Sequence, residues 1–360
     1  MVVRALLLIC VLFLGASPES PQAKQAKIYV DAVRELNEKH AGSPGKETED
    51  ELAKQLPPAA SKALDALLAS SSGKEMTQAL RAVSEAAMDL DRSDDFARIR
   101  ARLGKDAGKD AAKLDTMVSK ARFVLRGADG IDTEYLDHFA EVLDGVLSAY
   151  DEVFGFEQWS KVPGKKLRVR VHLVDEIKGP PHFAPEFPFH SEIDFPVEDA
   201  KSFTSPTADG EFLFYGLCHE LGHVIAMWGD LRNEADHHAW AHYTGVAIVE
   251  HLSHAKDAPA WVKDMKDSKW RSLAIERTAA RSVKPSTESK EGVMALLLAL
   301  DDRVGPKSIG MAINNLDQKD HNLRVNRVRY YDFARFRKSL LEVTRDKEGR
   351  KAIEAAFGEE

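Results

Sequence analysis

Cysteine is nearly absent from this chain, which has only Cys10 and Cys218 among 360 residues. Cys10 lies in an apolar N-terminal run that we expect to be removed, which leaves Cys218 alone in the mature chain. A single cysteine excludes an intramolecular disulfide, so stability must come from packing of the core. Cys218 precedes a histidine, but helix neighbours point about 100° apart, and we interpret it as a small core residue rather than a ligand.

Long apolar runs are also missing after the N-terminus. The run at residues 5–15 follows a short positive start and is too short to span a bilayer comfortably. This pattern is typical of a signal peptide, so we expect residues 1–23 to be removed and the mature chain to begin between Ser17 and Lys24. An uncleaved membrane anchor is the alternative. No later segment reaches 18 apolar residues, so we expect no transmembrane segment in the mature chain and a secreted or periplasmic location.

An excess of positive charge is the third absence. The formal net charge is −8 and the pI is near 5.9, which argues against nucleic acid as the main partner. The content of 44% hydrophobic and 30% charged residues is that of an ordinary globular protein. A chain of this length exceeds one compact core, so we expect two domains.

The region from Lys24 to about Val118 is rich in alanine, and its apolar residues recur at helical spacing, as at Leu64, Leu67 and Leu68. It contains no catalytic motif and no fixed-period repeat. Glycine, proline and serine interrupt it at residues 42–45, 57–58, 70–73 and 104–108. We therefore predict an all-helical accessory domain over residues 24–118, separable because a polar, glycine-containing stretch joins it to the rest.

The pattern changes near Ala121. The sequence predicts a strand at 122–126, an amphipathic helix at 135–154 capped by Thr133, a strand at 167–174, a proline-rich loop at 179–188 and an edge strand at 189–197. This order is typical of an α+β domain with a small mixed sheet. Apolar helical patterns follow beyond Tyr243. We therefore predict an α+β domain over residues 119–360.

A metal-binding motif follows the predicted sheet. Residues 218–223 read C-H-E-L-G-H, an H-E-x-x-H motif flanked by apolar residues that predict a buried helix. His219 and His223 are four residues apart and share one helix face, where two imidazoles can bind one Zn²⁺. Glu220 adjoins them, and a carboxylate there can act as general base toward a zinc-activated water. Gly229 is the expected helix stop.

The succession of strand, helix, strand, edge strand and H-E-L-G-H resembles the gluzincin metallopeptidases, the thermolysin-like and aminopeptidase-like zinc hydrolases. The resemblance covers residues from about Lys120 to the end, with specific residues only between His219 and about Tyr243. It implies a zincin-like fold, His219 and His223 as zinc ligands, and Glu220 as general base. It also implies a third ligand on the next helix and an edge strand that aligns the peptide substrate.

The third ligand is where the chain departs from this family. The pair at residues 233–234 is similar to the Asn-Glu pair that carries the third ligand in thermolysin-like enzymes, yet only ten residues separate Glu234 from His223. The run 238–243 is similar to the Glu-Gly-x-Ala-x-Tyr run of aminopeptidase-like members, with His238 where their glutamate stands. The resemblance therefore offers both Glu234 and His238.

Helix geometry offers the same two candidates. If the two helices form a hairpin centred near residue 230 or 231, residues equidistant from the centre lie level, so His223 faces His238 and His219 faces His242. Glu234 would lie about 6 Å above His223, unless the first helix ends early. Glu234 and His238 both remain candidates.

Several nearby residues have possible supporting roles. Asp236 is a lesser candidate ligand; Asp236, His237 and His242 are otherwise either groups that orient the ligand imidazoles or exposed polar residues. The metzincin pattern is absent, because no histidine follows His223 at the required spacing. The candidates for stabilising an oxyanion are Tyr215, Tyr243, His321, Tyr330 and Tyr331.

The sequence therefore predicts a secreted zinc-dependent hydrolase, a metallopeptidase that cleaves peptide bonds in a peptide or protein substrate with Zn²⁺ as cofactor. Glu220 is the predicted general base, and the metal ligands are His219, His223 and either Glu234 or His238. The alternative is a catalytically inactive zincin-fold binding or scaffold protein. That alternative stays open because the third ligand is either Glu234 or His238, so an acidic ligand is not assured.

Overall fold

The structure is a computed structural model of the 360-residue chain. It describes residues 20–41, 54–90, 92–107, 115–120, 122–128, 131, 133–155, 167–173, 182–186, 190–197, 214–223, 234–256, 279, 281–319 and 333–358. The chain divides into two compact units, one formed by residues 1–40 and 49–114 and the other by residues 41–48 and 115–360. Most of the expected signal peptide lies outside the described residues.

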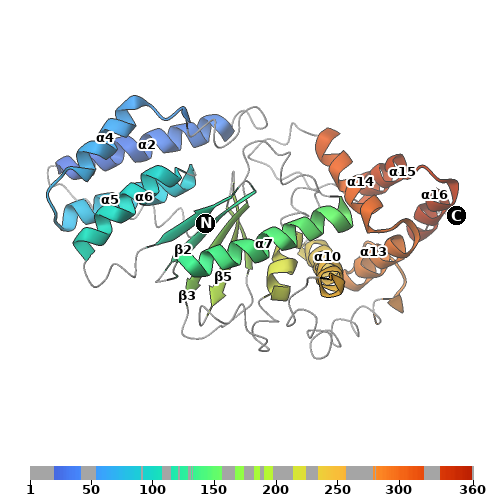
Figure 1. The fold of residues 1–360 in the computed structure, drawn as a ribbon. Helices are drawn as coiled ribbons and strands as arrows, with labels where there is room; N and C mark the ends of the chain where they lie inside the picture. The colour runs from blue at the N-terminus through green and yellow to red at the C-terminus, as the bar shows by residue number, and fades with distance from the viewer. Residues whose placement is uncertain are drawn as a thin grey trace. The chain divides into compact units, whose positions relative to one another are not determined.

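The first unit is helical. Its elements are α2 (Pro21–Ala41), α4 (Pro58–Leu68), α5 (Lys74–Asp89) and α6 (Ser93–Ala107), drawn in blue and cyan in Figure 1. The predicted proline break precedes α4, which begins with Pro58 in its first turn, where the missing N–H has no intrahelical partner to lose. The helical pattern expected to continue to about Val118 ends earlier, because residues 116–119 form a strand of the second unit.

A buried carboxylate joins two helices of the first unit. Asp95 of α6 is only 5% exposed. Its Oδ2 accepts hydrogen bonds from the Tyr29 hydroxyl of α2 at 2.8 Å and from Arg92 Nε at 2.7 Å, and its Oδ1 lies 3.6 Å from Arg98 Nη1. Burial, with Asp95 adding to it, raises the pKa of Tyr29. The charge of Asp95 is therefore paired inside the unit.

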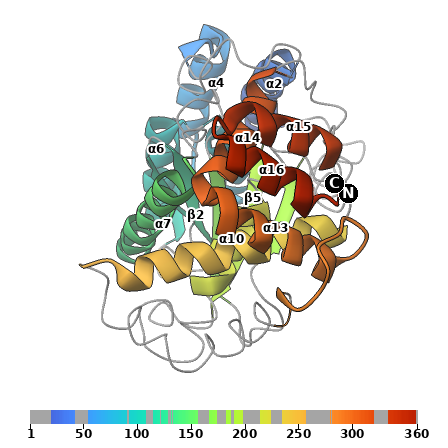
Figure 2. The same cartoon turned by 90° about the vertical axis from the view of Figure 1, so that its right-hand side faces the viewer.

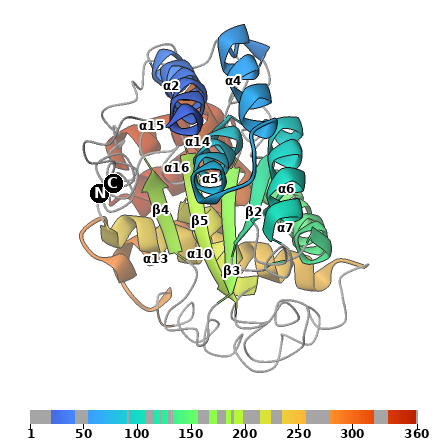
Figure 3. The same ribbon diagram turned by 90° about the vertical axis from the view of Figure 1, so that its left-hand side faces the viewer.

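The second unit contains one five-stranded mixed sheet (Figure 3). Its strands are β1 (Thr116–Ser119), β2 (Phe123–Ala128), β3 (Leu167–Leu173), β4 (His182–Glu186) and β5 (His190–Val197). Their order in the sheet is β1-β2-β3-β5-β4, with parallel β2–β3 and β3–β5 pairs and antiparallel β1–β2 and β4–β5 pairs. The fold is thus mixed α+β and mostly helical.

Two expectations about this sheet were wrong. The segment predicted as a proline-rich loop contains β4, and the predicted edge strand at 189–197 is β5, which lies between β3 and β4. Among the described strands, β4 is the edge on this side of the sheet. Pro185 explains the error, since proline argues against an interior strand but is tolerated at an edge, where its missing N–H needs no partner.

The long helix α7 (Thr133–Phe154) confirms the helix predicted from its amphipathic pattern. The Phe139 ring meets Phe195 of β5 edge-to-face at 5.0 Å between centroids. The apolar residues of the inner face are all buried: Leu136, Phe139, Leu143, Val146, Leu147 and Tyr150. Arg122, just before β2, donates to Asp144 and Asp151 of α7 and fixes the helix against the sheet. The helix and one sheet face therefore form the core beside which the metal motif lies.

The C-terminal half is helical, as predicted (Figure 2). Its helices are α10 (Glu234–His254), α13 (Lys290–Val304), α14 (Pro306–Lys319), α15 (Phe333–Val343) and α16 (Lys347–Ala356). The break between α13 and α14 falls at Gly305, whose positive φ of 77° suits glycine. Helix α10 contacts both α7 and α13. Within the described residues, no helix is long and apolar enough to cross a membrane.

Candidate metal centre

The motif residues lie on a helix over residues 214–223, called here the motif helix. Phe214, Leu217, Cys218 and Leu221 are buried on it, which confirms both the predicted core helix and the interpretation of Cys218 as a core residue. Burial raises the pKa of the Cys218 thiol, so this side chain stays protonated and unsuited to metal binding. The helix stop expected at Gly229 lies outside the described residues.

Two glycines, Gly222 and Gly245, allow the backbones of the motif helix and α10 to approach each other closely. A Cβ atom on Gly222 would lie 2.4 Å from Thr244 Oγ1 and 2.7 Å from the Ala241 Cα. A Cβ atom on Gly245 would lie 3.1 Å from the Cα of His219. Such close approach brings side chains of the two helices into direct contact, which larger residues at these positions would prevent. No sequence motif marks this role of the two glycines.

Three histidines meet where the helices approach. The candidate ligand atoms of His219, His223 and His238 all lie within 4.8 Å of one another. The ring of His223 lies 4.8 Å from each of the other two rings and nearly perpendicular to both. The rings of His219 and His238 are 5.9 Å apart and inclined by 26°. Among the described residues this is the one cluster of metal-ligand type, and it contains three of the sequence-predicted residues.

The cluster fits a zinc ion in donor type and spacing. Three nitrogens bound tetrahedrally at about 2.1 Å are about 3.4 Å apart, so candidate ligand atoms that lie within 4.8 Å of one another need to close in by at most about 1.4 Å. His223 is buried, His219 partly buried and His238 at least partly exposed. A ligand set that opens on one side leaves room for a fourth ligand and for substrate.

The environment keeps His219 neutral. Burial is the largest influence, followed by the neighbouring His223, His242 and His238, and together they lower the pKa of His219 to about 2. Lys290, at the start of α13, acts in the same direction. A neutral imidazole is the form that ligates a metal, so the site holds His219 in the binding form across the ordinary pH range.

Glu220 occupies the position expected for a general base, directly after His219, and is only 6% exposed. The helix that carries it is anchored from α7, where the Tyr150 hydroxyl donates to the Cys218 carbonyl at 2.6 Å and lies 3.4 Å from Thr244 Oγ1. Burial raises the pKa of Tyr150, and Glu220 contributes to that rise. The neighbouring hydroxyl therefore remains a donor that fixes the motif helix.

A tyrosine and a fourth histidine lie beside the cluster. The Tyr215 hydroxyl lies 2.6 Å from His242 Nδ1 and 3.4 Å from His219 Nδ1. His242 is 9% exposed. Tyr215 was one candidate for stabilising an oxyanion, and His242 was one candidate for orienting a ligand imidazole. Tyr215 lies four residues before His219, and this spacing places the tyrosine next to the His219 ring on the same helix face.

The remaining candidates divide into two groups. Tyr243 is buried with its ring against Phe154 and Trp240, at 5.8 and 6.0 Å between centroids. The others lie outside the described residues or side chains: Glu234, Asp236, His237, His321, Tyr330 and Tyr331. The structure therefore brings His238 into the cluster and leaves Glu234 untested.

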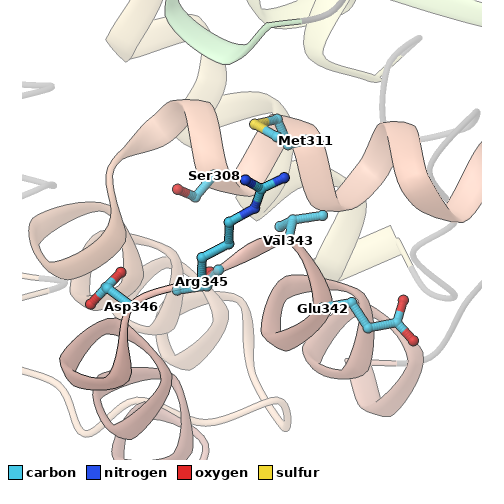
Figure 4. A pocket seen from close by; sticks show the side chains of 7 residues that line it. Ser308, Met311, Glu342, Val343, Arg345 and Asp346 are labelled. Atoms are coloured by element: carbon cyan, nitrogen blue, oxygen red, sulfur yellow. The ribbon is translucent and has the colours of Figure 1, made fainter.

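A depression elsewhere on the second unit serves as a contrast (Figure 4). It lies between α14 and the turn that joins α15 to α16, and none of the sequence-predicted site residues lines it. Its Asp346 is already used, since the carboxylate accepts from the Gly349 N–H and caps α16. The histidine cluster is therefore the candidate site.

These observations define a mixed α+β protein in which two closely packed helices bring together three histidines, beside a buried glutamate. Comparison with protein-family models, with curated proteins and with solved structures found no match. The residues of the site itself are therefore the basis for inferring function.

Proposed function

We propose that the protein is a zinc-dependent hydrolase of the metallopeptidase type, with His219, His223 and His238 as the zinc ligands. The observation that carries this proposal is the meeting of the H-E-x-x-H histidines with a third histidine from the next helix. Catalytic zinc sites have three protein ligands and one open position, and three histidines are among the known sets. With His238 in the third place, all three ligands are neutral.

The order of the elements supports a zincin-like fold for residues 119–360. In chain order β1, β2, the long helix α7 and the strands β3, β4 and β5 precede the motif helix, and helices make up the rest of the described residues. The edge is β4, which runs antiparallel to β5. An open edge pairs with an extended peptide through main-chain hydrogen bonds, which is the alignment that the gluzincin resemblance implies for a peptide or protein substrate.

The chemistry is divided between the metal and Glu220. Zinc, when bound, lowers the pKa of a water molecule toward 7 and polarises the scissile carbonyl. Glu220 accepts the proton of the attacking water and passes it to the leaving amine. Tyr215 is not assigned to the oxyanion, since its hydroxyl contacts Nδ1 of His219, the ring nitrogen directed away from a metal bound at Nε2. The N-terminal pattern of residues 1–23 supports a secreted or periplasmic location.

Metal analysis combined with an activity assay tests the proposal. The purified protein and a Glu220→Gln variant are assayed for zinc content and for cleavage of an unstructured protein. Zinc in both proteins, with cleavage by the parent alone, supports the enzyme. Zinc in both without cleavage by the parent supports the binding or scaffold alternative. Absence of zinc from both contradicts the proposed metal centre.

A further inference from the structure

Tyr215 and His242 form a layer next to the proposed ligands. Tyr215 lies four residues before His219 on the motif helix, and His242 lies four residues after His238 on α10, so each is one turn from a ligand. The Tyr215 ring is inclined by 48° to His219 at 5.8 Å between centroids and by 80° to His242 at 6.1 Å. The two residues therefore contact the cluster without belonging to it.

The contacts of the Tyr215 hydroxyl use Nδ1 of both histidines, at 3.4 Å for His219 and 2.6 Å for His242. With Nδ1 of His219 facing the hydroxyl, Nε2 is the nitrogen left for a metal. A neutral imidazole has one ring proton, so a lone pair on Nε2 requires the proton on Nδ1. His219 then donates to the Tyr215 oxygen, and the single proton of that hydroxyl is donated to Nδ1 of His242.

The opposite direction of donation is incompatible with metal binding. If Tyr215 donated to His219, the proton of that imidazole would lie on Nε2, and this nitrogen would have no lone pair for zinc. The direction of the hydrogen bond between Tyr215 and His219 depends on His242. When Nδ1 of His242 accepts the hydroxyl proton of Tyr215, that proton is no longer available for donation to His219. His242 is only 9% exposed, so water has little access to the Tyr215 hydroxyl in place of His242 Nδ1.

We propose that Tyr215 and His242 are positioning residues that hold His219 in the tautomer and orientation in which Nε2 is available to zinc. This inference rests on the proposed function of the metal centre. Partners of this kind fix the ligand ring, and their loss costs about 10–100-fold in metal affinity. Neither residue touches the reacting atoms.

Four variants of the full chain separate positioning from general packing. Tyr215→Phe removes the hydroxyl and keeps the ring, and His242→Leu removes the acceptor. His242→Asn restores an acceptor oxygen near the position of Nδ1. Tyr243→Phe is the matched control. Tyr243 follows His242 on α10, and its ring packs against Phe154 and Trp240, so this change also removes one tyrosine hydroxyl and keeps the ring. Tryptophan fluorescence during thermal unfolding verifies that each variant is folded.

Two readouts are used: zinc affinity, by competition with a chromophoric chelator, and the tautomer of His219, by imidazole ¹⁵N NMR. We expect Tyr215→Phe and His242→Leu to bind zinc about 10–100-fold more weakly and to lose the preference for Nδ1–H in His219. His242→Asn should recover much of the affinity, and Tyr243→Phe should match the parent.

The outcomes distinguish the inference from the proposed function. Zinc binding by the parent, with equal affinity and an unchanged His219 tautomer in Tyr215→Phe and His242→Leu, overturns the inference alone. The same affinity loss in Tyr243→Phe as in Tyr215→Phe also overturns it, because the effect would then be one of packing. A parent protein that binds no zinc overturns the proposed function and the inference together.

Discussion

The two units of the chain bury ionisable side chains in opposite ways. In the first unit, buried Asp95 is surrounded by the hydroxyl of Tyr29 and the guanidinium groups of Arg92 and Arg98. In the second unit, the ring of His219 faces other imidazoles, and its neighbours His223, His242 and His238 all lower its pKa further. The first arrangement pairs opposite charges, whereas the second gathers groups that disfavour one another's protonation.

The difference indicates which site is structural and which is functional. A buried carboxylate paired with arginine is satisfied by its own chain and joins two helices. Neutral imidazoles that converge on one point satisfy only part of their hydrogen-bonding capacity through one another, and they offer lone pairs to a cation. We therefore expect changes at Asp95 to affect stability alone, and changes at the histidines to affect metal binding first.

The largest expected effect is the loss of zinc from ligand variants. His219→Ala, His223→Ala and His238→Ala should each weaken zinc binding well beyond the roughly 100-fold typical of supporting residues, because each removes one of three ligands. Glu234→Ala is the matched control, and it should lose at most about 100-fold. Chelator competition measures all four. The reverse result, with Glu234→Ala releasing zinc and His238→Ala retaining it, would replace His238 by Glu234 as the third ligand.

The next effect tests the paired charge of the first unit. Asp95→Ala leaves Tyr29 and Arg92 without their acceptor, and it should lower the free energy of unfolding of this unit by about 3 kcal/mol. The control is Asp31→Ala, which removes ion pairs with the exposed Lys27 and Arg34 and should cost less than about 0.5 kcal/mol.

Spectroscopy can follow the Asp95 variant unit by unit. All five tryptophans lie at residues 159–270 in the second unit, so their fluorescence reports that unit alone, whereas far-ultraviolet circular dichroism reports both. The Asp95→Ala transition should shift by circular dichroism while the tryptophan transition and the zinc affinity stay in place. A change in zinc affinity would break the distinction between the two units.

A smaller effect concerns the approach of the two site helices. Gly222→Ala forces a Cβ atom against Thr244 and Ala241 and should destabilise the second unit by about 2 kcal/mol, with weaker zinc binding because His238 is displaced. Gly145→Ala is the control, since a Cβ atom on this exposed glycine of α7 meets nothing within 4 Å and should stabilise by about 0.5–1 kcal/mol. Equal stability and zinc affinity in both variants would show that the helices do not need contact at Gly222.

Several elements of the second unit were predictable from the sequence, because local periodicity predicts helices and strands directly. The amphipathic pattern of α7 and the alternation in β3 gave both elements, and the i, i+4 spacing predicted that His219 and His223 share a face. The prediction of the sheet edge was wrong for two reasons. Pro185 made the segment of β4 resemble a loop, and strand order depends on pairing between distant segments.

The third ligand shows where sequence reasoning stops. Hairpin geometry placed His238 level with His223, and the two rings do meet. It could not decide between His238 and Glu234, because helix rotation and separation depend on contacts such as those at Gly222 and Gly245. The contact of Tyr215 with His219 follows from their i, i+4 spacing, whereas its contact with His242 depends on how the two helices pack and has no local sequence signal.

A pH dependence of the zinc-free protein tests the neutral state of buried His219. The pKa of His219 is about 2 in the folded state, against about 6.5 in an unfolded chain. Between these values the unfolded chain binds a proton that the folded protein does not, so stability falls as pH decreases below about 6.5. The slope is about 1.4 kcal/mol per pH unit for this group. Tryptophan-monitored denaturation should show it, with a flatter profile for His219→Gln; identical profiles would contradict neutral burial of His219.

Zinc K-edge X-ray absorption of the zinc-loaded protein shows directly whether three histidines bind one zinc ion. We expect three imidazole nitrogens at about 2.0–2.1 Å and one oxygen ligand, with two imidazoles remaining in any zinc-bound His238→Ala sample. A spectrum of the parent with only two imidazoles, or one unchanged by the His238→Ala substitution, would contradict the three-histidine centre.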